Sequence, residues 1–168
     1  MLTGCTTQGW QVHLALQRLA GLRKSESDNL EITDVDLDEK FICVHCSKTA
    51  RADGNPDRMV PILYPQLERL LKIAIAEADA SQQFLVPLTV ARSRGTAYQT
   101  FARICRRAGL KKWREPFKCL RRSCATELRR RFGASYVTDW LGHSEDVEQK
   151  HYLRVTESVD ELRKRLRL

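Results

Sequence analysis

Residues 118–152 read KCLRRSCATELRRRFGASYVTDWLGHSEDVEQKHY, and this stretch combines helix-forming sequence with a set of reactive polar side chains. Lys118 and Arg121 are spaced to lie on one face of a helix, from which both cationic groups would project. Gly142 is a helix stop, His143 follows it at once, and Tyr152 comes nine residues later. Arginine can spread phosphate charge in a transition state, and a tyrosine oxygen can become a covalent nucleophile. The pattern therefore indicates metal-free phosphodiester chemistry and an enzyme that acts on nucleic acid.

The sequence around this stretch predicts an α+β fold that is mostly helical. Apolar spacing and end signals predict helices over residues 10–19, 65–78, 96–109, 116–133, 135–141, 144–152 and 155–166, and a turn or short helix from Leu22. Thr96, Ser135 and Ser144 are the expected N-caps of three of them. Residues 30–33, 40–44 and 58–62 are rich in β-branched residues and predict a small three-stranded antiparallel sheet, with an acidic turn at 36–39.

The composition is typical of a single-domain globular protein, and its charge balance favours a polyanionic partner. It has 168 residues, of which 42% are hydrophobic and 30% charged, which argues against wholesale disorder. Lys and Arg number 29 against 21 Asp and Glu, giving a net charge of +8. Such a balance favours binding to nucleic acid, because cationic side chains release the counterions of phosphates. Composition alone would also fit a merely basic protein.

The cysteines predict reduced thiols rather than a disulfide framework. All 6 are scattered through a chain long enough to fold without cross-links. The N-terminus shows no signal peptide, and no apolar run has the length of a membrane helix, so we expect a cytoplasmic protein without membrane contact. The run Cys43-Val44-His45-Cys46 suggests zinc, but strand alternation would divide it between two faces, and no second ligand pair lies at finger-like spacing. We therefore expect neither a metal site nor a cofactor.

The chain carries an ordered set of motifs: Gly21-Leu22-Arg23-Lys24-Ser25-Glu26, Lys48-Thr49 ahead of Arg58-Met59-Val60-Pro61-Ile62, Lys118-Cys119-Leu120-Arg121 with Ala125-Thr126, Leu141-Gly142-His143-Ser144, and Tyr152. Together these motifs resemble those of the catalytic domain of the tyrosine recombinases, the phage integrase family of site-specific DNA recombinases, and the match runs from about residue 10 to 155. Single elements are weak signals, whereas the ordered set is specific.

The resemblance implies a role for each matched residue. Tyr152 would attack the scissile phosphate and form a 3′-phosphotyrosyl link with release of a 5′-hydroxyl. Arg23 and Arg121 would hold the non-bridging oxygens through their planar forks. His143 would donate a further hydrogen bond, and Lys48, in a β-hairpin, would be the general acid for the leaving oxygen.

One position departs from the family's common pattern. Lys118 stands where a histidine is usual, and an ammonium with an ordinary pKa near ~10.4 is a poor base at neutral pH. We therefore assign Lys118 to phosphate contact. Glu26 is expected to orient Arg23 or to cap a helix, and His151 to be an exposed helix residue.

The resemblance also implies partners and a domain organisation. Double-stranded DNA is the expected substrate, and a homo-oligomer, a tetramer on DNA, is expected in the full-length context. Family members usually carry an N-terminal core-binding domain, so residues 1–168 are interpreted as the catalytic domain alone: an excised domain, a truncated product or a minimal recombinase. Residues 155–168 would form a tail helix that docks on a neighbouring subunit or packs on its own domain. A catalytically lapsed DNA-binding module and a topoisomerase-like enzyme remain alternatives.

Overall fold

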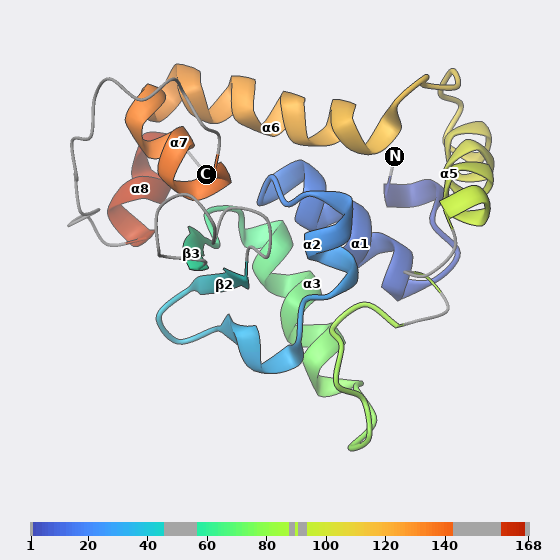
Figure 1. Cartoon of the computed structure of the whole chain (residues 1–168), viewed down its shortest axis with the longest axis horizontal. Coiled ribbons are helices and arrows are strands. Elements are labelled where there is room, and N and C mark those ends of the chain that lie inside the picture. Colours follow the sequence, from blue (N-terminus) through green and yellow to red (C-terminus); the bar gives the residue numbers. More distant parts are fainter. Residues whose placement is uncertain (1, 46–56, 88–89, 91–93, 143–158, 167–168) are drawn as a thin grey trace.

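Seven α-helices and a small sheet make up the part of the chain that the structure describes, and the sheet lies at one side of the helices (Figure 1). A computed structural model gives residues 2–45, 57–87, 90, 94–142 and 159–166. The helices are α1 (Gln8–Leu19), α2 (Lys24–Asp28), α3 (Pro65–Ala76), α5 (Arg94–Arg107), α6 (Pro116–Phe132), α7 (Ala134–Leu141) and α8 (Val159–Leu166). None of these described helices is long and apolar enough to cross a bilayer. The sheet holds β1 (Val35–Asp36), β2 (Phe41–His45) and β3 (Asp57–Pro61) in that order, all antiparallel, and confirms the predicted α+β class.

The first strand lies later in the chain than the sequence predicts. Residues 30–33 were expected to be extended, but Ile32–Asp34 forms a 3-10 turn. The carboxylate of Asp34 accepts a hydrogen bond from the backbone N–H of Glu31 at 2.8 Å, which favours the turn over a strand ladder. Val35 pairs with Ile42 instead, so the strand enters the segment expected to be purely a turn. The prediction of a strand at 30–33 is therefore wrong, whereas the number and direction of strands are right.

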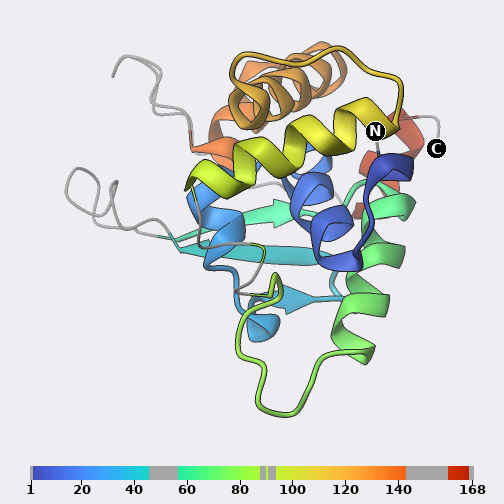
Figure 2. The same cartoon turned by 90° about the vertical axis from the view of Figure 1, so that its right-hand side faces the viewer.

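Helix α1 lies at the centre of the core. Val12, Leu14 and Leu16 are fully buried on it, because α3 packs against one side of the helix and α6 against another (Figures 1 and 2). A helix that is apolar on most of its circumference requires such cover on several sides. α7 in turn packs against both α6 and β3. This arrangement brings the end of α1, the start of α2, β3 and the end of α7 to one region.

Two of the predicted helix caps are wrong. α5 already begins at Arg94, so Thr96 lies inside it. α7 begins at Ala134, so Ser135 is also internal. Gly133 takes the place of the expected serine: its φ of 94° ends α6 and its extended ψ starts α7 at the same residue. The third expected cap, Ser144, and the predicted helix 144–152 lie outside the described residues.

Helix α8 packs on its own domain in this structure. The side chain of Leu162 is fully buried in the common core. Arg163 donates hydrogen bonds to the backbone oxygens of Ile62 at 3.0 Å and Leu63 at 3.1 Å, and it pairs with Glu68 at 2.5 Å. These carbonyls follow β3, so α8 is fastened to the exit of the sheet. Docking of this tail on a neighbouring subunit stays a prediction.

Candidate active site

The turn between α1 and α2 positions Arg23 with its side chain half in solvent. Gly21, at φ 67°, allows the chain to reverse after α1, and Arg23 directly precedes α2. Glu26 accepts hydrogen bonds from the backbone N–H of Arg23 and from its guanidinium, both at 2.6 Å. Glu26 therefore performs both of the roles expected from sequence, since it caps α2 and orients Arg23. The Arg23 side chain remains 43% exposed and thus accessible to a ligand.

Arg58 is a central member of the site, although the sequence indicates no role for it beyond its place in the motif Arg58-Met59-Val60-Pro61-Ile62. From β3, its guanidinium donates to both oxygens of Glu26, at 3.0 and 2.6 Å, and both side chains are only 8% exposed. Its Nε donates to the backbone oxygen of Trp140 at 2.8 Å. The fork of two parallel bonds fixes the plane of the Glu26 carboxylate. The sequence predicted that Arg58 lies in a strand, but it did not indicate the hydrogen-bond partners of its guanidinium, which lie on α2 and α7.

Arg121 is buried rather than projecting to solvent beside Lys118. Its Nη1 donates to the backbone oxygen of Gly21 at 2.5 Å, its Nη2 donates to that of Leu141, and it lies 3.5 Å from the Glu26 carboxylate. The expectation that Lys118 and Arg121 project together is therefore wrong for Arg121. α6 turns this face towards α1 and α7, and a buried cation is tolerated because free carbonyls at the ends of those helices accept from it.

These contacts create a surplus of positive charge around one carboxylate. Burial, and then the charges of Arg23 and Arg58, lower the pKa of Arg121 to about 10, although Glu26 opposes the change. Burial alone would raise the pKa of Glu26, but hydrogen bonds and charge from Arg58, together with hydrogen bonds from Arg23, lower it to about 2. Three guanidinium groups thus share one firmly ionised carboxylate. Such a site favours the approach of a further anion.

The same arginines hold the C-terminal end of α7. Arg58, Arg121 and Arg23 donate to three successive backbone oxygens, those of Trp140, Leu141 and Gly142 respectively. The last carbonyls of a helix have no partner within it and carry its negative dipole end, so cations are favoured there. Gly142 closes α7 in the left-handed conformation, with φ 59°. The chain therefore enters the segment that begins with His143 from a point fixed by three guanidinium groups.

Lys118 lies one helical turn from Arg121 and on the surface. Its side chain is 73% exposed, and its ammonium pairs with Glu115 at 2.7 Å within the same stretch of chain. The hydrogen bond and charge of Glu115 raise the pKa of Lys118. The structure thus places Lys118 beside the arginine cluster along α6, but its described ion pair is with Glu115 and not with a member of that cluster.

Three predicted site residues, Lys48, His143 and Tyr152, lie outside the described residues, as does His151. Their roles stay predictions. Lys48 belongs to the segment between β2 and β3, whose facing ends, His45 and Asp57, share a hydrogen bond of 2.8 Å.

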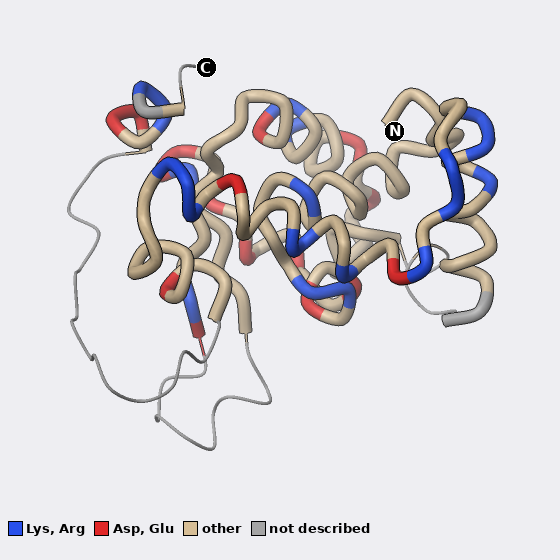
Figure 3. Tube along the Cα trace, turned by 90° about the horizontal axis from the view of Figure 1, so that it is seen from above, with Lys and Arg blue, Asp and Glu red and all other residues tan. Residues whose placement is uncertain are grey.

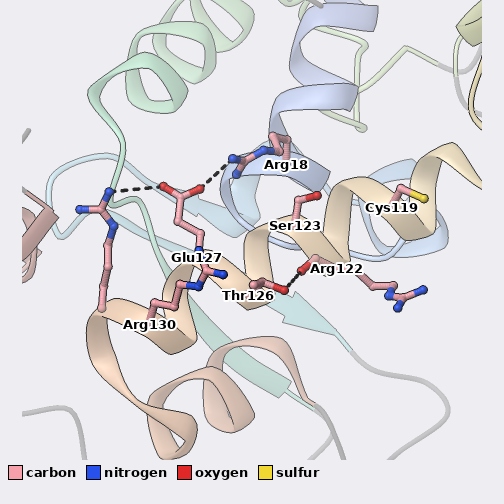
Figure 4. A pocket seen from close by; sticks show the side chains of 8 residues that line it. Arg18, Cys119, Arg122, Ser123, Thr126, Glu127 and Arg130 are labelled. Atoms are coloured by element: carbon pink, nitrogen blue, oxygen red, sulfur yellow. Dashed lines mark hydrogen bonds and ion pairs between the residues drawn. The ribbon is translucent and has the colours of Figure 1, made fainter. Parts of the chain in front are cut away.

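A second group of charges lines a groove along α6 and the end of α1, and Arg121 is not part of its lining (Figure 4). Glu127 pairs there with Arg18 at 2.7 Å and with Arg131 at 3.8 Å. All of these side chains are at least a quarter exposed, so solvent screens the pairs and they add little stability. The groove joins α1 to α6 and is distinct from the arginine cluster around Glu26.

Comparison with known proteins assigns this architecture to a family. The sequence model described as the phage integrase family matches residues 6–158. A tyrosine recombinase from Pseudothermotoga lettingae is 27% identical over 145 residues, which are 86% of this chain and 49% of that protein. The crystal structure of XerA recombinase matches with a TM-score of 0.69 at 23% identity, covering 86% of this chain and 53% of that chain. The chain thus spans about half the length of the relatives it matches.

Proposed function

The chain belongs to the phage integrase family, and from this premise we propose that it is the catalytic domain of a site-specific DNA recombinase. The proposed reaction cleaves and rejoins DNA through a 3′-phosphotyrosyl intermediate. One observation carries the proposal: Arg23 and Arg121, far apart in sequence, donate to adjacent carbonyls at the peptide that leads to His143. A metal-free phosphoryl transfer needs such a preorganised cluster of donors to stabilise the charge of the transition state.

In the proposed mechanism the Tyr152 hydroxyl gives up its proton to solvent, and its oxygen attacks the scissile phosphorus as the bond to the 5′-oxygen breaks. Lys48 gives its proton to that leaving oxygen, and His143 donates a hydrogen bond to the phosphate. Arg23 binds a non-bridging oxygen directly, because its guanidinium is the accessible one of the cluster, at 43% exposed. The phosphotyrosyl bond conserves the energy of the broken phosphodiester, so a second 5′-hydroxyl can reverse the step on a new partner.

For Arg121 we propose an electrostatic and positioning role. Its contacts to the carbonyls of Gly21 and Leu141 tie the turn that carries Arg23 to the end of α7. Its buried charge adds to the field at the phosphate, where low exposure to water makes it effective. Replacement by lysine would keep the charge but lose the two-carbonyl fork, so Arg121→Lys is expected to lose most activity.

Lys118 is proposed to contact phosphate rather than to act as a base. Glu115 raises its pKa, so the ammonium stays protonated at neutral pH and cannot accept a proton there. The contact with Glu115 is exposed on both sides and therefore easily exchanged for a phosphate of the DNA.

Double-stranded DNA is the proposed partner, met by the basic surface of α5 and α6. Basic residues gather along the chain at the end of α5, in the segment that leads to α6, and on α6 itself (Figure 3), and most of their side chains are exposed. Arg106 and Arg107 lie in the last turn of α5, and Lys111, Lys112 and Arg114 follow. Such a stretch neutralises phosphates without reading sequence. In the full-length context we propose a tetramer on DNA in the cytoplasm.

A nicked suicide substrate tests the nucleophile. The chain is incubated with a pool of nicked duplexes randomised around the nick, and covalent adducts are resolved on a denaturing gel. We expect an adduct that disappears in Tyr152→Phe and persists in Tyr98→Phe, the matched control at an exposed tyrosine of α5. An equal adduct in Tyr152→Phe would refute the nucleophile. DNA binding with no adduct would indicate a lapsed binding module. In a parallel assay on supercoiled plasmid, relaxation without strand exchange would indicate a topoisomerase-like enzyme.

The general acid is tested separately from the nucleophile. Lys48→Ala should slow cleavage of ordinary DNA, because the 5′-oxygen would then leave without a proton. A substrate with a 5′-bridging sulfur leaves without protonation and should restore the rate. Failure of this rescue would remove Lys48 from the role.

A further inference from the structure

Three potential metal ligands share one face of the sheet at the open end of the β2–β3 hairpin. Cys43 and His45 alternate with the buried Ile42 and Val44 along β2, so both point away from the core. Asp57 of β3 lies opposite His45 in the ladder. One donor atom from each of Cys43, His45 and Asp57 lies within 4.8 Å of the others. Strand pairing thus brings together a ligand set whose third member is distant in sequence.

The chemistry of the set suits a zinc-class ion. Thiolate sulfur, imidazole nitrogen and carboxylate oxygen are the three donor types that Zn²⁺ uses, and three protein ligands with one open position form a common coordination pattern. Asp57 and the nearby Asp34 also supply negative charge that attracts a cation. The Nδ1 of His45 is 2.8 Å from an Asp57 oxygen, so an ion held by both groups would replace the proton between them.

The Nε2 of His45, the ring nitrogen that faces away from Asp57, contacts a carboxylate, as the second ring nitrogen of a metal-bound histidine usually does. This nitrogen is 3.0 Å from a carboxylate oxygen of Asp34, whose side chain is only 10% exposed. The other Asp34 oxygen accepts the backbone N–H of Glu31 at 2.8 Å, which fixes the carboxylate. A carboxylate that accepts from one ring nitrogen orients the ring and leaves the other nitrogen for the ion. This second contact distinguishes the cluster from a chance group of polar side chains.

We propose that Cys43, His45 and Asp57 bind a divalent ion of the Zn²⁺ class, with Asp34 as the positioning residue behind His45. The ion would join the last residue of β2 to the first residue of β3. It would thereby link the two ends of the segment that contains Lys48, and it takes no part in the phosphoryl transfer proposed above. An ion pair of His45 with the two aspartates is the competing explanation, and the test distinguishes the two.

Cobalt provides the direct readout. The full chain, reduced with a phosphine and freed of metal with a chelator, is titrated with Co²⁺. We expect a thiolate-to-cobalt charge-transfer band that saturates at one equivalent and is displaced by Zn²⁺, which binds such sites more tightly. Cys43→Ser should abolish the band, and Cys119→Ser, a half-buried cysteine on α6, should keep it. Asp34→Asn should keep the band but weaken affinity by about tenfold, a loss typical of second-layer partners.

A measurement on the unaltered chain guards against variants that fail to fold. Zn²⁺ should slow alkylation of Cys43 at least tenfold, read by mass spectrometry, and leave the rate at Cys119 unchanged. No saturable band, a band that survives Cys43→Ser, or unchanged alkylation of Cys43 would each overturn the site and leave the His45 ion pair as the explanation.

Discussion

Replacing Glu26 by glutamine removes the negative charge that Arg23, Arg58 and Arg121 share while keeping the shape of the side chain. Glu26 forms a two-bond fork with Arg58, and both side chains are 8% exposed. Breaking a buried ion pair on one side leaves the partner charge uncompensated. In Glu26→Gln three guanidinium groups would face one another without a counter-charge.

The lowered pKa of Glu26 gives the size of the effect. Its value falls from 4.5 to about 2 on folding, because Arg58 and Arg23 outweigh the cost of burial. This difference corresponds to about 3 kcal/mol at neutral pH, since each tenfold change in an ionisation constant is worth ~1.4 kcal/mol. A carboxyl with a depressed pKa stabilises the fold fully above its unfolded value, and the contribution disappears as the pH falls from 4.5 towards 2.

Urea unfolding followed by tryptophan fluorescence measures this loss, since Trp140 lies at the end of α7 that Arg58 contacts. At pH 7 the free energy of unfolding of Glu26→Gln should be lower than that of the unaltered chain by about 3 kcal/mol, with an unchanged urea slope. The difference in the free energy of unfolding between the two proteins should become smaller below pH 4.5. Glu115→Gln, at an exposed pair with Lys118, is the control and should not differ measurably. Equal free energies of unfolding at pH 7, or a difference that stays constant down to pH 3, would refute the claim that the charge of Glu26 stabilises the fold.

Substitutions at three further positions test other parts of the structure. Gly21→Ala would place a methyl group against Leu141 at a φ of 67°, so a loss of about 2 kcal/mol is expected in urea unfolding. Leu162→Ala would empty a fully buried position of α8 and should cost about 3 kcal/mol, with earlier proteolysis of the C-terminal segment; no change would mean that α8 does not pack on its own domain. For Lys118, adduct formation on nicked DNA should be retained in Lys118→His and lost in Lys118→Ala; retention in both would exclude a phosphate contact.

The sequence determined most of the helices because their signals are local. Pro116 and Gly133 bound the long helix α6 as predicted, since one residue fits only the first turn and the other only the end. The prediction failed where a single side-chain hydrogen bond or one backbone angle decides the conformation of a few residues. Asp34 draws residues 32–34 into a turn, and Gly133 replaces the expected serine cap of α7. These outcomes depend on geometry that residue type alone does not specify.

The sequence by itself also singled out Arg23 and Arg121, because the ordered motifs that contain them can be recognised without a structure. Only the tertiary structure decided that Arg121 is buried, that Arg58 completes the cluster, and that Asp57 meets Cys43 and His45 across the ladder. The physical reason is that charge–charge contacts and ligand sets are fixed by distances between elements, which helix and strand packing sets. Spacing along the chain determines which face a residue occupies, whereas packing determines what it meets there.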